Sequence, residues 1–370
     1  MNKKNKDKGA GLFDVLTIGP ARVAISVTIP ILAFALLRWS FIFMRDSNAS
    51  KIVIGLIALL VGVFGVWILF LSTDNLVSHF PRKIKEALRP FVFVGPALTV
   101  LGIYLVYPSI STLITSLFNR KGDTFVGLKN YIFALTNEDM VMTLRNNLLW
   151  LVFVTFFTVS LGLVIAVLVD KIKWEKIAKS LIFMPMAISF VGAAVIWKFI
   201  YYYQPPGEAQ IGLLNAIVVA LGGDPVGWLI QKPFNNFFLM VIMIWLQTGY
   251  AMVILSAAVK GVPSSLMEAA RIDGANEFTI FFHVIIPYIK GMILTVTTTI
   301  LIAVLKIFDI VFVMTSGQYD TSVVALRYYK ESFVFRNYGR GSALAVILLI
   351  AVVPILIYNI KTLRESRRVR

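Results

Sequence analysis

Apolar runs long enough to cross a lipid bilayer recur along this chain of 370 residues. Because a transmembrane helix needs about 20 mostly apolar residues, the runs predict about eight spanning helices. Composition agrees, since 58% of the residues are hydrophobic and 15% are charged, against about a quarter charged in soluble domains. We therefore predict an all-α polytopic membrane protein. The predicted spans lie near Val23–Met44, Ile52–Leu71, Phe91–Leu117, Asn147–Val169, Ser180–Tyr203, Phe237–Ala257, Ile289–Ser316 and Gly341–Ile360.

The spacing of these runs divides the chain into an N-terminal pair of helices and a larger C-terminal block of six. The linker between them contains Leu76–Arg89, whose pattern suits either a helix lying along the inner membrane face or a solvated connecting helix. The expected divisions are a basic tail over 1–22, two extra transmembrane helices over 23–71, a basic amphipathic linker over 72–90, a transmembrane domain over 91–360 and a second basic tail over 361–370.

Lysine and arginine set the expected orientation. With the N-terminus inside, the segments that face the cytoplasm carry most of the basic residues, which is the bias of multi-pass membrane proteins. We therefore expect cytoplasmic N- and C-termini. We attribute the net charge of +16 to topology and to attraction toward anionic lipid, and not to a nucleic-acid surface. The start of the chain lacks the apolar core and cleavage site of a signal peptide, so we expect it to be retained. The absence of cysteine excludes disulfides and thiolate metal sites.

A polar segment, Val262–Pro287, interrupts the apolar pattern between two predicted spans. Pro263 suits the first turn of a helix, Gly274 suits a helix end, and Pro287 would stop the helix that follows. The piece Ser264–Asp273 is too short to cross a membrane. The pattern predicts two short helices, hinged at Gly274, that project from the membrane and grip another protein. The alternative is an ordinary amphipathic connecting helix.

Within this segment, EAARIDGA followed by FFHVIIP resembles the coupling-loop signature of bacterial ABC import permeases, with Val284 and Ile286 as conservative departures. The run 91–360 resembles the binding-protein-dependent carbohydrate permeases of the maltose-transporter type, supported by the motifs PAL, FVGLKNY and VFVMTSG. The stretches QIGLLNAI and LKIFDIVFVMTSG further resemble the α-glucoside branch. The positions that match the coupling-loop signature are Glu268, Ala269, Ala270, Asp273, Gly274 and Pro287.

The resemblance implies a transporter subunit that is not an enzyme and binds no cofactor itself. The chain contains no G-x-x-x-x-G-K-[ST] motif, so its energy must come from a separate subunit. The implied partners are a second permease subunit, two ATP-binding subunits that hold ATP and Mg at the cytoplasmic face, and an extracytoplasmic sugar-binding protein, all at a bacterial inner membrane. Ala269 and Ala270 would allow close approach to the ATPase. Glu268 and Arg271, at i and i+3, would divide the tasks of bracing the loop and facing the partner.

Polar side chains within two predicted spans are candidates for the substrate pathway, because polar groups in a bilayer usually face a cavity or a partner. The candidates are Gln247, Thr248 and Tyr250 in one span, and Thr299, Lys306 and Asp309 in the other. Gln247 and Thr248 could instead hold helices together through hydrogen bonds, and Lys306 and Asp309 could simply neutralise each other within one helix.

The resemblance places Tyr250 at an aromatic position of the sugar pocket and Gln247 at a position where the family has glycine. It also places Val304 and Ile307 where the family has asparagine. The function it implies is ATP-driven import of an α-glucoside or related oligosaccharide. The alternatives are a gradient-driven secondary transporter that uses Lys306 and Asp309 as an ion relay, or an ABC permease for glycerol-phosphate or polyols.

Overall fold

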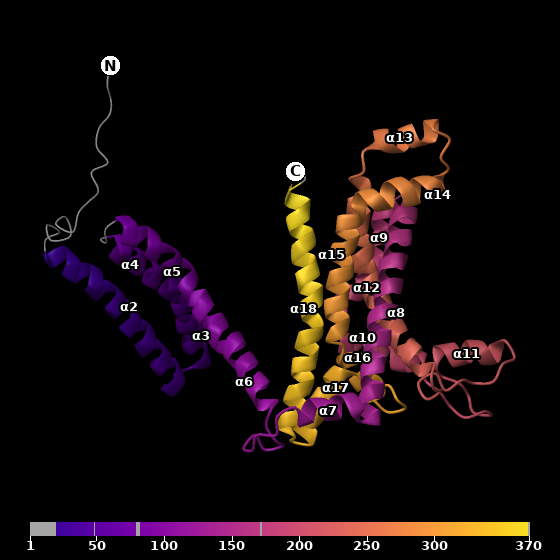
Figure 1. Cartoon of the computed structure of the whole chain (residues 1–370), viewed down its shortest axis with the longest axis horizontal. Helices are drawn as coiled ribbons and strands as arrows, with labels where there is room; N and C mark the ends of the chain where they lie inside the picture. Colours follow the sequence, from indigo (N-terminus) through magenta and orange to yellow (C-terminus); the bar gives the residue numbers. More distant parts are fainter. Residues whose placement is uncertain (1–19, 48, 79–81, 171, 369–370) are drawn as a thin grey trace. The chain divides into compact units, whose positions relative to one another are not determined.

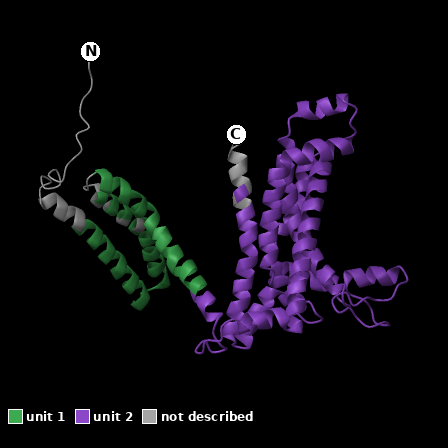
Figure 2. Ribbon diagram, viewed as in Figure 1, with its two compact units in different colours: residues 1–110 green, residues 111–370 purple. Residues whose placement is uncertain are grey.

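The computed structural model describes residues 20–47, 49–78, 82–170 and 172–368, so most of the predicted N-terminal tail lies outside the described residues, and the predicted C-terminal tail is described up to residue 368. Every regular element over these residues is helical, which agrees with the predicted fold class. The chain separates into two compact units, Met1–Ile110 and Ser111–Arg370, coloured green and purple in Figure 2.

Unit 1 contains the N-terminal helices, and α4 packs against both α2 and α5. An ion pair of 3.0 Å between Asp74 of α4 and Arg89 of α5 fastens this packing, and the rings of Phe70 and Phe93 meet edge to face. Most other apolar side chains of the unit are exposed, as lipid-facing helices require. The elements are α2 (Pro20–Asp46), α3 (Lys51–Leu60), η1 (Val61–Gly65), α4 (Val66–Ser78), α5 (Arg82–Leu101) and η2 (Gly102–Val106), followed by α6 (Tyr107–Thr115), which crosses into unit 2.

The predicted amphipathic linker is not a separate element. Leu76–Ser78 end α4, residues 79–81 lie outside the described residues, and Arg82–Arg89 form the first turns of α5, which continues into the following span. Pro90 lies inside α5 without ending it.

Unit 2 is built around α12, which packs along α8 and also contacts α9, α10, α15 and α16 (Figure 1). The elements are α7 (Lys129–Thr136), α8 (Glu138–Val169), α9 (Glu175–Phe183), η3 (Met184–Ala187), α10 (Phe190–Ile200), α11 (Leu213–Ala220), α12 (Asn235–Lys260), α13 (Ser264–Ile272), α14 (Glu277–Ile280), η4 (Phe281–Ile285), α15 (Ile286–Leu305), α16 (Asp309–Met314), α17 (Val324–Tyr329), η5 (Lys330–Val334) and α18 (Tyr338–Arg368).

Small residues set the spacing between these helices. A Cβ on Gly162 of α8 would lie 2.6 Å from the Cβ of Ala251 on α12, and a Cβ on Gly249 would lie 2.4 Å from the backbone oxygen of Ile182 on α9. Helices in a bilayer gain no hydrophobic free energy by associating. Van der Waals contact between backbones that approach closely at such small residues stabilises the association instead. The α8–α12 interface therefore buries large side chains such as Trp150 and Met252 completely.

The number of spans differs from the predicted eight. Six helical stretches of the described residues are long and apolar enough to cross a membrane, and a bent pair can supply a seventh. The predicted span Ile52–Leu71 falls on α3, η1 and α4, where the apolar part, Lys51–Gly65, is shorter than a bilayer requires. The six are Thr28–Asp46, Arg82–Thr115, Glu138–Val169, Asn235–Lys260, Glu277–Leu305 and Tyr338–Tyr358, and the bent pair is Glu175–Ala187 with Phe190–Ile200.

Two predicted spans are interrupted. The run Ser180–Tyr203 bends by 102° between η3 and α10, where Ile188 is extended and the Ser189 hydroxyl caps α10 by accepting a hydrogen bond from the Gly192 amide. The run Ile289–Ser316 breaks after Leu305, and α16 begins afresh at Asp309. The first break follows Pro185 in η3, whereas the second, over residues 306–308, contains neither glycine nor proline and could not be predicted from the apolar pattern.

A Gly249→Ala substitution tests the packing of α12 against α9. The added methyl would overlap backbone that cannot move independently, so we expect a loss of about 1–3 kcal/mol in the free energy of unfolding. Thermal unfolding of the purified chain in detergent measures this. Gly291→Ala is the matched control, because a Cβ at Gly291 meets nothing within 4 Å. An equal effect of both substitutions would contradict the close approach.

Candidate functional site

The hinge of the loop between α12 and α15 forms at Gly274, as predicted. Gly274 has a φ of +84°, a left-handed conformation that favours glycine. The Ala275 amide donates to the Ala270 carbonyl at 2.9 Å, and the Gly274 amide donates to the Arg271 carbonyl at 3.1 Å. These two bonds make a Schellman motif that satisfies the last carbonyls of α13. The turn is therefore held by backbone geometry, and the chain reverses sharply after Asp273.

The second helix of the loop starts at its own cap. The Asn276 side chain accepts hydrogen bonds from the Thr279 amide at 2.8 Å and from the Thr279 hydroxyl at 2.9 Å, which satisfies a donor in the first turn of α14. Pro263 is the N-cap residue of α13, one position before the predicted first turn. Both helices of the loop therefore have defined starts, and the stretch between them, Asp273–Asn276, is short.

Pro287 does not stop a helix, contrary to the prediction. It lies in the first turn of α15, which continues from α14 through η4, so that Glu277–Leu305 is one helical run. The π-helical turn Phe281–Ile285 directly precedes the proline. Widening of the helix at such a turn accommodates the missing N–H and the bulk of the ring.

Arg271 braces the loop and Glu268 does not. The Arg271 guanidinium lies 3.1 Å and 3.0 Å, through Nε and a terminal nitrogen, from one carboxylate oxygen of Glu277, which joins α13 to α14. Glu268 is exposed, and within the described residues no ion pair or hydrogen bond engages its side chain. Of the predicted pair, Arg271 therefore braces the loop, and Glu268 is an exposed acidic group on the surface of α13.

The loop has one face packed on the unit and one face open. Met267, Ala270 and Ala275 pack against the core of unit 2, whereas Ile272 and Phe278 are 87% and 78% exposed. Ala269 is exposed beside Glu268. Figure 1 shows α13 lying beyond the ends of α8, α12 and α15. An exposed apolar patch on a projecting, internally braced loop is a surface suited to contact with another protein.

Of the pathway candidates on α12, Gln247 lies at a hollow. Gln247 and Leu246 line a cavity of about 230 Å³ together with Met186, Ile188, Ser189 and Phe190, at the bend between η3 and α10. Gln247 is half-buried, and its amide has no hydrogen-bond partner among the described residues. A polar amide without a partner at a hollow within a membrane-spanning bundle is able to bind the hydroxyl groups of a ligand.

The other two candidates on α12 differ from Gln247. The Thr248 hydroxyl donates to the Ile244 carbonyl of its own helix at 2.6 Å, so it is not a hydrogen bond between helices. Tyr250 is half-buried and packs against the core cluster. Gln247 and Tyr250, at i and i+3, therefore carry the open polar groups of this helix face.

Lys306 and Asp309 do not share a helix face, contrary to the prediction. Lys306 caps the end of α15, Asp309 opens α16, and Ile307 and Phe308 lie between them outside any helix. Lys306 is exposed and Asp309 is half-buried, and the described residues show no ion pair between them. A spacing of three residues brings two side chains together only within a continuous helix, and here the helix ends before Asp309.

The remaining positions around this break carry little polarity. The Thr299 hydroxyl is exposed and donates to the Thr295 carbonyl at 3.0 Å. Val304 and Ile307, at the positions where the resemblance has asparagine, are 0% and 2% exposed and belong to the apolar core. Their burial explains why this chain has apolar residues there.

Sequence analysis missed a set of asparagines at the ends of α8 and α12. Asn146 donates to the carbonyls of Asp320 and Ser322 at 2.7 Å and 2.9 Å, and Asn235 donates to the Tyr319 carbonyl at 2.7 Å. These bonds hold a loop in which Tyr319 and Asp320 adopt positive φ values of 56° and 62°. The repeated Asn-Asn pairs, 146–147 and 235–236, were the signal in the sequence.

A charged network at the opposite end of the same helices was also missed. Lys179 of α9 lies 2.5 Å from Asp170 and 2.6 Å from Glu175. The Ser256 hydroxyl of α12 donates to Asp170 at 2.7 Å, and Lys260 pairs with Glu175. The network joins α8, α9 and α12 near the C-terminal end of α12, where the loop begins. Glu175 and Lys179 are spaced i and i+4 in the sequence, but Ser256 and Lys260 are far from them, so only the fold completes the network.

Comparison with known proteins identifies relatives over most of the chain. A family model described as the binding-protein-dependent transport system inner membrane component matches residues 158–370. An osmoprotective compounds uptake permease protein of Synechocystis sp. is 58% identical over 279 residues, covering 75% of this chain and 100% of the relative. An alpha-glucoside transport system permease protein of Rhizobium meliloti is 49% identical over 334 residues, covering 86% and 99%.

Solved structures agree in fold. A bacterial ABC transporter involved in the import of the acidic polysaccharide alginate contains a chain that matches with a TM-score of 0.65 at 18% identity, covering 78% of this chain and 98% of that one. The same transporter in complex with an alginate pentasaccharide-bound periplasmic protein gives 0.66 at 18% identity, covering 78% and 97%. This likeness confirms the predicted all-α architecture.

A Gly274→Ala substitution tests the hinge. Because the left-handed conformation costs an L-residue about 1–2 kcal/mol and open space surrounds the position, we expect local loosening without global unfolding. Hydrogen exchange should rise several-fold at the amides of α13 and α14 and stay unchanged in α8 and α12. Asp273→Ala, one position earlier at a φ of −72°, should leave exchange in the loop unchanged. Protection that survives Gly274→Ala would contradict the assigned role of the hinge.

Proposed function

Because the chain belongs to the family of binding-protein-dependent transport system inner membrane components and is a permease subunit of an ABC sugar importer, we propose that its substrate is an α-glucoside or a related oligosaccharide. The single observation that carries this proposal is the 49% identity, over 86% of this chain and 99% of the relative, with an alpha-glucoside transport permease. The partner-free amide of Gln247 at the hollow of about 230 Å³ supports it, because neutral sugars are bound through hydroxyl groups.

The chain forms half of the translocation pathway, and a second permease subunit supplies the other half. Two ATP-binding subunits, which hold the ATP and Mg, dock at the cytoplasmic face, and an extracytoplasmic binding protein delivers the sugar. Membership of a family of binding-protein-dependent transport components supports the presence of these partners. Their number is part of the proposal. Both termini lie in the cytoplasm. The end of α18 lies on the same side of unit 2 as α13 (Figure 1), which supports this orientation for the C-terminus.

The loop from α13 to the start of α15 transmits the movement of the ATPase. Glu268 and Ala269 face the ATPase from the open side of α13, together with Ile272, and Ala270 seats the helix on the unit. Arg271, Asp273 and Gly274 fix the shape of the turn, and Pro287 belongs to the helix that receives the movement. A stiff turn is suited to this task because a flexible one would absorb the displacement.

In the pathway, Gln247 and Tyr250 contact the sugar through an amide and an aromatic ring. Thr248 and Thr299 shape their helices through bonds to backbone carbonyls. Lys306 and Asp309 lie at the break between α15 and α16 and offer separate charges to the pathway. Since they form no pair within the described residues, the ion-relay alternative has no geometric support.

A second candidate substrate is an osmoprotective compound. An osmoprotective compounds uptake permease is 58% identical to this chain and is matched over its whole length. An osmoprotective solute that carries hydroxyl groups could bind the Gln247 amide as a sugar would.

ATP hydrolysis by the complete importer in liposomes tests the coupling role. With sugar-loaded binding protein present, Gly274→Asp should lower the stimulated rate roughly tenfold, equal to about 1.4 kcal/mol of coupling, because it strains the turn and adds a charge beside the docking face. Gly122→Asp is a matched control, since Gly122 has a φ of +82° and open surroundings in a loop far from α13. Uptake that follows an imposed ion gradient and ignores ATP would overturn the proposal.

A Gln247→Ala substitution tests the sugar contact. Loss of one or two hydrogen bonds to the substrate should raise the KM for uptake roughly tenfold to a hundredfold, while basal ATP hydrolysis stays near the wild-type value. Uptake of α-glucosides and of an osmoprotective solute is measured side by side, so that the two candidate substrates are ranked. Gln231→Ala removes the same side chain at an exposed position before α12 and should leave both values unchanged. An unchanged KM in Gln247→Ala would remove this residue from the pathway.

A further inference from the structure

The turn between α8 and α9 carries a hollow whose lining includes none of the loop or pathway residues described above. The hollow has a volume of about 590 Å³ and opens to the surface of unit 2. Trp174 is 70% exposed there, beside Ile172 and Ile177 at 47% and 54%. Large apolar side chains gathered at a surface mark a contact with lipid or with protein. The lining residues are Ile172, Lys173, Trp174, Glu175, Lys176 and Ile177.

The charges around the hollow are unbalanced. Glu175 is engaged by two lysines of the network described above, Lys179 and Lys260, and Asp170 is engaged by Lys179 and by the Ser256 hydroxyl. The acidic groups of the turn are therefore already paired. Lys173 and Lys176 are exposed and have no acidic partner among the described residues.

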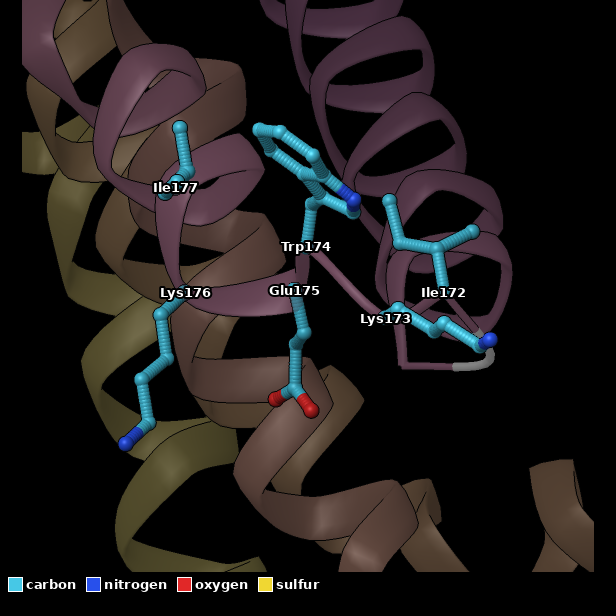
Figure 3. A pocket seen from close by; sticks show the side chains of 6 residues that line it. All are labelled: Ile172, Lys173, Trp174, Glu175, Lys176 and Ile177. Atoms are coloured by element: carbon cyan, nitrogen blue, oxygen red, sulfur yellow. The ribbon is translucent and has the colours of Figure 1, made fainter.

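The side chains of the turn divide by polarity. Figure 3 shows the ring of Trp174 and the side chains of Ile172 and Ile177 extending to one side of the turn, while Lys176 extends to the other. The apolar side is the side toward which α8 and α9 run. Tryptophan is enriched where a span meets the headgroups, and lysine places its ammonium group outward from that level while its stem stays on apolar surface. Because α8 is a spanning helix that ends at Val169, the turn lies at this boundary.

We propose that this turn binds an anionic phospholipid, with Lys173 and Lys176 holding the headgroup phosphate and Trp174, Ile172 and Ile177 contacting the upper acyl chains. The unpaired positive charge selects an anionic over a zwitterionic headgroup, and the apolar side selects a lipid over a free anion. The site does not depend on which sugar is transported. Only its assignment to the cytoplasmic leaflet rests on the proposed orientation.

The test titrates the full-length chain, purified in a neutral detergent, with phosphatidylglycerol or phosphatidylcholine and counts bound lipid by native mass spectrometry. Each lysine near the headgroup adds to the affinity for an anionic lipid. Replacing both, in Lys173→Gln/Lys176→Gln, should therefore weaken phosphatidylglycerol binding roughly thirtyfold. Lys173→Arg/Lys176→Arg should retain binding. Lys121→Gln/Lys129→Gln removes the same charge from exposed positions away from this turn and should have no effect. Trp174→Ala should weaken binding of both lipids.

Three outcomes would overturn the proposal. Equal binding of the two lipids by the wild-type chain would show that the lysines do not select charge. Displacement of phosphatidylglycerol by millimolar inorganic phosphate would assign the site to a free anion. Unchanged binding of phosphatidylglycerol by Lys173→Gln/Lys176→Gln would show that these lysines do not hold the headgroup. Because lipid binding is measured without the ATPase or sugar, failure here leaves the proposed transport function standing.

Discussion

The close approach of α12 to its neighbours is the constraint on which unit 2 depends. A bilayer offers no hydrogen-bond partners to the backbone, so spanning segments must be helical, and it offers no hydrophobic free energy to hold helices together. Contact at small residues replaces that free energy. Gly162 meets Ala251 and Gly249 meets the backbone at Ile182, at separations that no larger residue permits. These contacts fix α8 and α9 on α12 and determine which side chains become buried.

The two interrupted spans follow from the same constraint. Non-helical backbone at membrane depth is tolerated where protein buries it or where it lines a cavity. One break, at Ile188–Ser189, lies at the hollow that Gln247 lines. The other lies after Leu305, and the helices that follow the two breaks, α10 and α16, pack against each other. The breaks therefore belong to one region of the unit, where the Gln247 amide and the indole N–H of Trp197 on α10 have no hydrogen-bond partner among the described residues.

The sequence predicted features that depend on local chemistry. The all-α class followed from apolar runs, and the hinge at Gly274 followed from the need for a positive φ at a helix end. The role of Pro287 was predicted wrongly, since a proline in a first turn is tolerated and the π-helical turn before it accommodates the ring. The sequence left open whether Lys306 neutralises Asp309 within one helix; the described residues show no such pair, because one helix ends at Lys306 and another begins at Asp309. Within the charged network, only the i, i+4 spacing of Glu175 and Lys179 was a local signal, whereas the contacts to Ser256 and Lys260 of α12 had none.

Stiffness at the loop explains how a small displacement at α13 can reach the middle of the bundle. The loop is connected to unit 2 at its two ends. One end is α12, whose last residue, Lys260, forms an ion pair with Glu175 of α9, so that α9 and α12 are linked beside the loop. The other is the continuous run from Glu277 to Leu305, which ends at the break before α16. Two backbone bonds and the Arg271–Glu277 pair close the turn at Gly274. Under the proposed coupling role, a displacement of α13 passes along α12 toward Gln247 and along the second helical run toward Lys306, where the proposed pathway has its polar groups.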